Sequence, residues 1–354
     1  MPGGGGLHSW TRVSAILLTG ILATGLFVSS SVRPLASAGG EDLFFHETFQ
    51  GNGRTCSTCH DPRNEFTVSP ELVRERFKLD PGHPLFRAID SDDGQGRDYT
   101  TLLHHAVFRV TVPLAPNVSV VGDPTARSIT VWRGVPGLSN LALTAPYLQD
   151  GRAATLQDQA LGAIDAHMQP GRAVLPGELD AIAAFESELF YPLRIRSLLD
   201  DQDPLPKEPG FSVPFATTAA RKGKEIFDFK CRTCHDGETG NVPASPDIKP
   251  FASVFVSERN LPGFPMLSLS FRQPDGTEMI ALTPDPGRAA LTGDLLDLNE
   301  FDIAPLRGLK HTAPYFHDNS AATLQDLVDL YDEHFQFHLS PADKKNLVAY
   351  LELL

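Results

Sequence analysis

The 354-residue sequence predicts a mainly helical fold in two similar halves, and three observations support this prediction. A five-residue pattern, C-x-x-C-H, occurs twice, at 56–60 and at 231–235. A block of fifteen residues at 144–158 returns at 312–326 with eleven identical positions. Each block runs into a segment that starts at a Thr and has helical character. Because motif and block keep the same order in both halves, the chain is predicted to be an internal duplication at the scale of a domain.

The C-x-x-C-H pattern predicts covalent attachment of haem c at two places. Two thiols one helical turn apart can add to the two vinyl groups of one porphyrin, and the next residue offers its imidazole to the iron. A zinc site is the main rival, but its two cysteine pairs normally lie about 15–20 residues apart, and here the motifs start at 56 and 231. A dithiol redox pair would not need the histidine. All four cysteines of the chain are used, so the predicted attachment residues are Cys56, Cys59 and His60 in the first half and Cys231, Cys234 and His235 in the second.

Helix signals follow both repeated blocks. Thr155 and Thr323 are predicted N-caps, with Asp158 and Asp326 three residues later in the position of a capping box. A closing helix is expected in each half, at 178–190 and at 341–354, the second capped by Ser340. Segments 118–132 and 250–282 are richer in Val, Ser, Pro and Gly and are predicted to form loops with short strands.

The N-terminus predicts export. Arg12 precedes an apolar run at 13–28, and Ala36-Ser37-Ala38 follows as an A-x-A cleavage site. We therefore expect a signal peptide at 1–38, cleavage after Ala38 and a periplasmic location, with an uncleaved anchor as the alternative. The remaining length suggests a first haem domain at 39–198, a linker rich in Asp and Pro at 199–214 and a second haem domain at 215–354.

The charge balance limits the classes of partner. Without residues 1–38 the chain has 28 basic and 44 acidic residues, a net charge of −16. This disfavours nucleic acid and anionic membrane surfaces, and favours a basic or neutral protein partner.

The motifs together resemble those of bacterial dihaem cytochrome c peroxidases and their MauG-type relatives. The resemblance depends on the two C-x-x-C-H motifs, on the stretch from Asp150-Gly-Arg to Gly162, and on Pro305-Leu-Arg through Phe316-His-Asp. It implies an all-α fold of two tandem cytochrome c-like domains, each binding one covalent haem c, with irregular loops and short strands. It also implies that hydrogen peroxide or another oxidant reacts at the first haem. Electrons would come from a small periplasmic electron-donor protein through the second haem, and the assembly could be a homodimer.

Several positions depart from that family's pattern around the first haem. Gln159 matches the expected distal Gln, but Ala163 stands where a Pro is expected and Gln169 where a catalytic Glu is expected. Gln149 replaces a Trp that lies between the haems in relatives. The family's calcium-binding Asn falls near Gly134, and the acidic stretch at 90–94 lacks the closing Glu of a calcium loop. A solvated acidic turn is therefore expected at 90–94, and calcium remains an open expectation.

The sixth ligand of each iron is left open by the sequence. His167 lies on the helix face of Leu156, Ala160 and Ala163, and is an axial ligand, an unligated distal acid–base, or a packed histidine. For the second iron the candidates are His334 and Tyr331, with a slight preference for His334. Met168 is a weaker candidate at the first haem.

Two functional hypotheses therefore compete. The first is a peroxidase-like or MauG-like oxidoreductase with Gln159 and His167 in the distal pocket. The second is a non-catalytic electron-transfer cytochrome with two six-coordinate haems. A dihaem oxygenase of the rubber-cleaving type is a third, weaker hypothesis.

Overall fold

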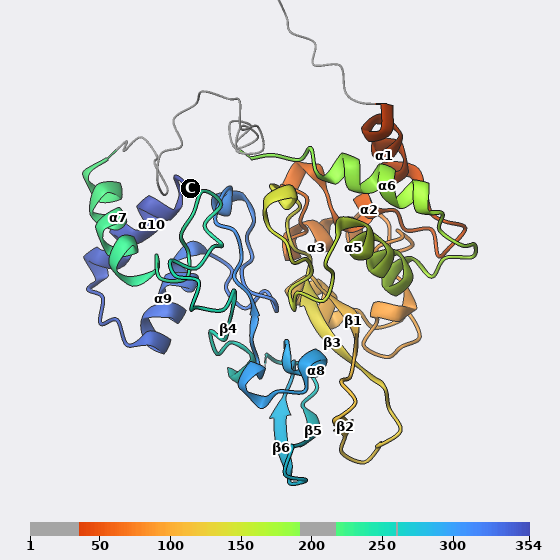
Figure 1. Ribbon diagram of the computed structural model, residues 1–354. Helices are drawn as coiled ribbons and strands as arrows, with labels where there is room; N and C mark the ends of the chain where they lie inside the picture. The colour runs from red at the N-terminus through yellow and green to blue at the C-terminus, as the bar shows by residue number, and fades with distance from the viewer. Residues whose placement is uncertain (1–34, 192–216, 260) are drawn as a thin grey trace, which may run out of the picture. The chain divides into compact units, whose positions relative to one another are not determined.

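The computed structural model describes residues 35–191, 217–259 and 261–354. Its helices fall into two groups along the chain, one before and one after the gap at 192–216, as Figure 1 shows. The first group comprises α1 (Leu35–His46), α2 (Cys56–Cys59), α3 (Pro70–Leu79), α4 (Thr100–His105), α5 (Leu156–Ala163) and α6 (Pro176–Glu186). The second comprises α7 (Thr218–Lys230), α8 (Ala289–Thr292), α9 (Leu324–Phe335) and α10 (Pro341–Leu351). The predicted signal peptide, cleaved after Ala38, lies mostly outside the described residues, as does the predicted linker at 199–214.

In each group, the helix before the C-x-x-C-H motif packs against the closing helix. α1 packs on α6, and α7 packs on α10. A glycine stands at each crossing: a Cβ on Gly40 would lie 1.9 Å from the Ala181 carbonyl oxygen, and one on Gly223 would lie 1.9 Å from that of Asn346. No larger residue fits there, so these two glycines set the close approach of the helices.

The helix starts predicted from the repeated blocks are confirmed. The Thr155 hydroxyl accepts a hydrogen bond from the Asp158 amide, and Thr323 does the same for Asp326, both at 3.1 Å. Ser340 caps α10 in the same way. These side chains satisfy amide groups that have no partner inside the helix. α6 begins two residues earlier than predicted and ends at Glu186, not at 190.

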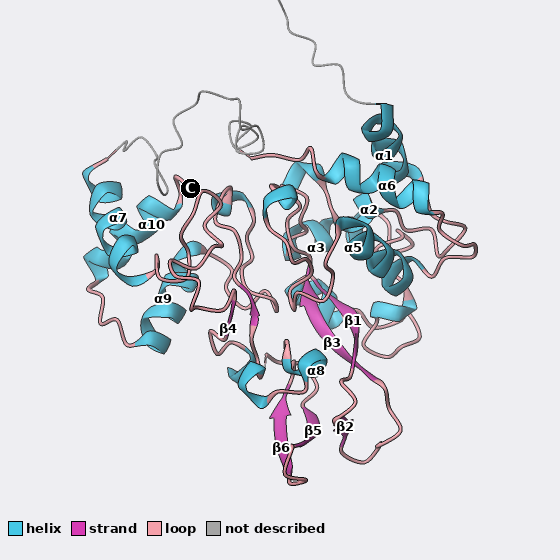
Figure 2. Cartoon of the chain, in the orientation of Figure 1, coloured by secondary structure: helices cyan, strands magenta, loops and turns pink. Residues whose placement is uncertain are grey.

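Strands form more of the structure than an all-α fold allows (Figure 2), so that part of the predicted fold class is too narrow. β1 (Val107–Pro113) pairs antiparallel with β3 (Ser128–Gly134). A second sheet has the order β2-β5-β6, from β2 (Val118–Val120), β5 (Leu267–Arg272) and β6 (Glu278–Thr283), and a third pairs β4 (Phe251–Ala252) with β7 (Phe301–Asp302). The prediction of short strands inside the irregular segments is confirmed.

The second sheet joins strands from both parts of the chain, because β2 pairs with β5. One buried cluster lies beneath it and includes Val112, Val118 and Ile129 from the first part and Leu269 and Phe271 from the second. Burial of such side chains contributes about 1.5–3 kcal/mol each. The two parts therefore share hydrophobic core, a feature that the prediction of tandem domains did not include.

A separate core supports each C-x-x-C-H motif. Phe49, Ala160, Ile164 and Ile182 pack around Cys56 in the first half. Phe227, Leu324, Val328, Leu347 and Tyr350 are among those that pack near Cys231 in the second. Within the described segments, no helix has the length and apolar character needed to cross a membrane.

Candidate haem sites

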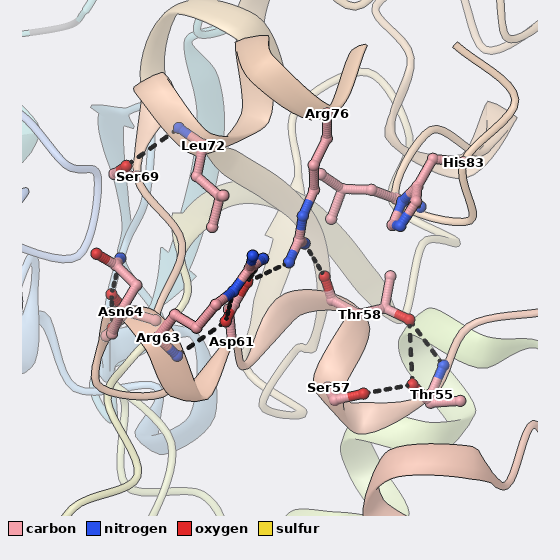
Figure 3. A network of polar contacts seen from close by, with 12 residues as sticks. Thr55, Ser57, Thr58, Asp61, Arg63, Asn64, Ser69, Leu72, Arg76 and His83 are labelled. Atoms are coloured by element: carbon pink, nitrogen blue, oxygen red, sulfur yellow. Dashed lines mark hydrogen bonds and ion pairs between the residues drawn. The ribbon is translucent and has the colours of Figure 1, made fainter. Parts of the chain in front are cut away.

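The first C-x-x-C-H motif forms a single helical turn. Cys56 and Cys59 begin and end α2, and the His60 amide donates to the Cys56 carbonyl at 3.0 Å. Thr55 precedes the turn, and its amide donates to the Thr58 hydroxyl at 2.9 Å. Arg76 of α3 donates to the Thr58 carbonyl at 2.6 Å and pairs with Asp61, as Figure 3 shows. These bonds fix the turn, so both thiols project from one short rigid segment.

His60 is oriented by its own backbone neighbour. Its Nδ1 lies 2.8 Å from the Phe66 carbonyl oxygen, which makes Nδ1 the protonated nitrogen. Burial lowers the pKa of His60 to about 4, so the ring is neutral at pH 7. The other nitrogen, Nε2, is left available for a metal ion, as is usual for a ligand whose orientation is fixed by an outer hydrogen bond.

A cavity of about 100 Å³, partly open to solvent, lies beside this motif. Cys59 and His60 line one part of the wall, while Gln159 and His167 come from α5 and the segment after it. The other lining residues are Phe108, Val110, Arg133, Gly134, Val135, Pro136, Leu148, Gln149, Arg152, Gly162, Ala163 and Ala166.

His167 is held at this wall by a break in helical geometry. Residues Ile164–Met168 form a π-helical turn directly after α5, and such turns occur often at functional sites. The His167 carbonyl accepts hydrogen bonds from Asn52 Nδ2 at 2.9 Å and from Arg54 at 3.3 Å. The residues just before the first motif therefore anchor the backbone of His167.

Two buried polar atoms in the cavity wall have no hydrogen-bond partner, Oε1 of Gln159 and Nδ1 of His167. Burial lowers the pKa of His167, so this imidazole is neutral at pH 7. A buried polar atom without a partner is costly, by about 1–3 kcal/mol. A bound group that supplied partners to both atoms would remove that cost.

The positions that depart from the family's pattern are also placed. Ala163 and Gln149 line the cavity. Gln169, at the position of the expected Glu, is not among the lining residues, and its side chain accepts from Asn52 at 3.1 Å. Met168 is buried in the core beside Ile164 and does not line the cavity, which leaves it a poor ligand candidate.

Side chains of the acidic segment at 90–94 bind other parts of the protein. Asp90 is fully buried and pairs with Arg54 at 2.7 Å, so the expectation of a solvated turn was wrong for this residue. Asp93 accepts from the Gln95 amide. Near Gly134, where relatives place a calcium ligand, the space is filled by Asn319, which donates to the carbonyls of His105 and Ala106.

The second motif repeats the proximal arrangement of the first. Cys231 follows the last residue of α7, and Nδ1 of His235 lies 2.7 Å from the Gly240 carbonyl oxygen. Burial lowers the pKa of His235, so this ring is also neutral. Both histidines thus keep Nε2 free for an iron.

The two candidates for the second sixth ligand, Tyr331 and His334, lie in different surroundings. Burial raises the pKa of the Tyr331 hydroxyl, and the nearby thiols of Cys231 and Cys234 raise it further, so this hydroxyl lies close to the second motif. The ring of His334 instead stacks on Phe255, with centroids 3.8 Å apart and 28° between planes.

The residues fit haem better than a metal ion held by the cysteines. All four cysteines are free thiols, and burial raises the pKa of Cys59 to about 11 and that of Cys231 to about 12. In the described part of the chain, no three His, Cys, Asp or Glu side chains gather in a metal-binding arrangement.

The sequence and the structure of this chain are similar to those of known proteins. Residues 37–190 match the family model of di-haem cytochrome c peroxidase. The chain resembles the dihaem cytochrome c peroxidase and MauG-like family. The resemblance drawn from the motifs is confirmed.

Two curated relatives extend the match beyond the first half. The cytochrome-c peroxidase IdrP2 of Denitromonas iodatirespirans is 24% identical over 338 residues, which cover 89% of this chain and 80% of that protein. The cytochrome c551 peroxidase of Pseudomonas aeruginosa is 26% identical, covering 63% of this chain and 64% of that protein. The crystal structure of a MauG-like protein associated with microbial copper homeostasis matches with a TM-score of 0.50 and 18% identity, over 92% of this chain and 90% of that one. These similarities support the dihaem peroxidase and MauG-like fold, and a peroxidase-like oxidoreductase in general terms.

Sequence reasoning missed the anchor of His167 and one buried acid. Arg54 and Asn52 precede the first motif by a few residues, and only that proximity marks them in the sequence. Glu186, at the end of α6, is fully buried near Cys56, and burial raises its pKa to about 8. A lone Glu near the end of an apolar helix carries no sequence signal of such burial.

Proposed function

We propose that this protein is a periplasmic dihaem c-type cytochrome oxidoreductase of the peroxidase or MauG-like kind. Hydrogen peroxide is reduced, or a partner is oxidised, at the site of the first motif. The electrons come from a small periplasmic electron-donor protein and enter at the site of the second motif. Each site holds one haem c, attached through Cys56 and Cys59 or through Cys231 and Cys234, with His60 and His235 as proximal ligands. Export with cleavage after Ala38 and tandem haem domains at 39–198 and 215–354 belong to the same proposal.

The single observation that carries this proposal is the set of polar side chains that converge in the largely apolar wall of the first cavity. His60 lies at one part of the wall, and the unpartnered atoms of Gln159 and His167 lie at another. Haem bound here would supply the redox chemistry of peroxide cleavage.

The chain's own residues would orient the oxidant and move its protons. The neutral His167 can accept a proton at Nδ1, which is the role that a distal base needs near pH 7. Oε1 of Gln159 can accept a hydrogen bond from a peroxide hydroxyl. With Gln169 turned to Asn52, His167 takes the acid–base role that the family gives to a Glu.

At the second site we propose Tyr331 as the sixth ligand. Its hydroxyl lies near both thiols, whereas His334 stacks on Phe255. Phenolate ligation favours the ferric state of a haem iron, as tyrosinate does in catalase.

The second candidate function is an electron-transfer cytochrome with two six-coordinate haems. The neutral imidazole of His167 in the cavity wall favours this function, because an unprotonated ring nitrogen could bind the first iron directly. In that case peroxide has no open position on the iron.

Low-temperature electron spin resonance of the ferric holoprotein separates the two functions. A high-spin signal from one haem, together with peroxide-dependent oxidation of the reduced protein, supports the oxidoreductase. Two low-spin signals that peroxide does not change contradict it. His167→Ala tests the ligand directly: it converts one low-spin signal to high-spin only if His167 binds the iron. Tyr331→Phe, with His334→Gln as the matched control on the same helix, should change only the second haem's signal.

A further inference from the structure

A four-residue segment, residues 301–304, connects the wall of the first cavity to the proximal histidine of the second motif. At one end, the Asp302 amide donates to the Gln149 carbonyl at 2.8 Å, and Gln149 lines the first cavity. At the other end, the backbone of Ala304 lies near the His235 ring and acts to raise the pKa of that ring. Two peptide units therefore separate the two contacts.

The segment is held firmly in place. Phe301 and Asp302 form β7, which pairs with β4, and the Ile303 amide donates to the Pro250 carbonyl at 3.0 Å. A Cβ on Gly151 would lie 2.5 Å from the Phe251 ring, so β4 also presses against the loop that follows Gln149. The strand pair β4–β7 is therefore packed closely against the loop that carries Gln149.

A second, parallel contact runs through aromatic rings. The Phe301 and His317 rings stack with centroids 3.8 Å apart and 12° between planes. The His317 carbonyl accepts from the Gly134 amide at 2.7 Å, and Gly134 lines the first cavity. Arg133 also lines the cavity, and its guanidinium carbon lies 5.4 Å from the centroid of the Phe301 ring.

We propose that residues 301–304, with the ring of His317, form the path by which an electron passes between the two sites. This inference rests on the proposed function, since it requires a haem at each motif. With a haem at each motif, one electron would pass from the second iron to the first. The second iron would then be oxidised by one electron and the first reduced by one electron. No bond forms or breaks and no proton moves. Neither ring has to be oxidised, because bonded and closely packed atoms form a continuous path for tunnelling.

Gln149, which has no aromatic side chain, joins the two contacts through hydrogen bonds. Its Nε2 donates to the Gly134 carbonyl at 3.2 Å and its own carbonyl accepts from Asp302, so both parallel contacts meet at this residue. The aromatic contribution comes instead from the second half of the chain, through Phe301 and His317.

The test measures redistribution of a single electron between the haems of the holoprotein, followed by their separate absorption bands after pulsed reduction. Phe301→Ala opens a gap in the path, and His317→Gln removes the stack while it keeps the main-chain bond to Gly134. We expect the redistribution rate to fall by about tenfold in each, because lost packing breaks atomic contact. Leu282→Ala, a large apolar residue of the same half that is 68% exposed on β6, is the control and should leave the rate unchanged.

Both reduction potentials and the thermal unfolding midpoint are measured for every variant. A slower rate with unchanged potentials supports the path. An unchanged rate in a folded His317→Gln or Phe301→Ala protein overturns it, and the stack is then only structural. Peroxide reduction by chemically reduced protein is assayed separately. If that activity is absent while the variants still slow redistribution, the proposed function fails and the path stands.

Discussion

Glu186 offers a direct test of the electrostatics beside the first motif. The side chain is 3% exposed, its Oε2 has no hydrogen-bond partner, and the ionisable groups that it influences are Cys56 and Tyr147. Burial raises its pKa from 4.5 to about 8. The folded protein therefore holds a proton on Glu186 at pH 7, whereas the unfolded chain releases it.

The sign of the effect follows from the number of bound protons. Between pH 4.5 and pH 8 the folded state binds one proton more than the unfolded state, so the free energy of unfolding falls as pH rises. Each pH unit in this window removes about 1.4 kcal/mol, and the whole window removes about 5 kcal/mol. Below pH 4.5 the contribution is constant, since both states are protonated.

The assay compares the wild-type protein with Glu186→Gln in urea unfolding at pH 5, 6, 7 and 8. Trp132 reports on the first half, because it is buried and is the only Trp among the described residues. We expect the variant to gain stability relative to wild type as pH rises, by about 4 kcal/mol from pH 5 to pH 8. Glu178→Gln is the control on the same helix: hydrogen bonds from Arg172 lower the Glu178 pKa, so its effect is confined to acid pH. Parallel curves for wild type and Glu186→Gln would refute the reasoning.

Three further predictions concern stability. Asp285→Asn should lower the free energy of unfolding by about 3–5 kcal/mol, because it leaves the buried Arg133 with only part of its charge paired. Urea or thermal unfolding measures this loss. A loss below about 1 kcal/mol would contradict the buried ion pair. Thr323→Ala should cost about 1 kcal/mol by removing the α9 cap, and no change in the unfolding midpoint would count against the cap. Gly223→Ala should destabilise by about 1–3 kcal/mol or more, because a methyl group meets α10. Gly177→Ala, where nothing lies within 4 Å, should instead be neutral or stabilise by up to about 1 kcal/mol, and equal effects at the two glycines would contradict the close packing.

Local features of this chain could be predicted from the sequence because their causes are local. The turn of α2 and the caps at Thr155 and Thr323 depend on residues within four positions of one another. The repeated block also predicted that two distant parts of the chain would fold alike, and both blocks form the same antiparallel bridge, Tyr147 with Ala153 and Tyr315 with Ala321.

Features that depend on distant partners could not be predicted. Tyr331 and His334 lie within one turn of α9, so spacing alone allows either to face the second motif. In the structure the His334 ring stacks on Phe255, a partner almost eighty residues earlier that no local pattern indicates. Likewise the acidic sequence around Asp90 predicted a solvated side chain, but Asp90 is buried and pairs with Arg54, a residue that precedes the first motif. The sheet of β2 with β5 joins residues about 150 positions apart and has no signal in either strand alone.

The charges around the first cavity indicate which kind of oxidant it suits. Arg133 pairs with Asp150 and Asp285, and Arg152 also pairs with Asp150. Burial acts to raise the pKa of Asp150, but Arg133 and Arg152 outweigh it and hold that pKa below its usual value. Two guanidinium groups therefore face two carboxylates, and this part of the wall has no net charge. His60 and His167 are neutral as well. A site without net charge gives no electrostatic advantage to an anionic substrate, so its polar atoms are better matched to a small uncharged oxidant such as hydrogen peroxide.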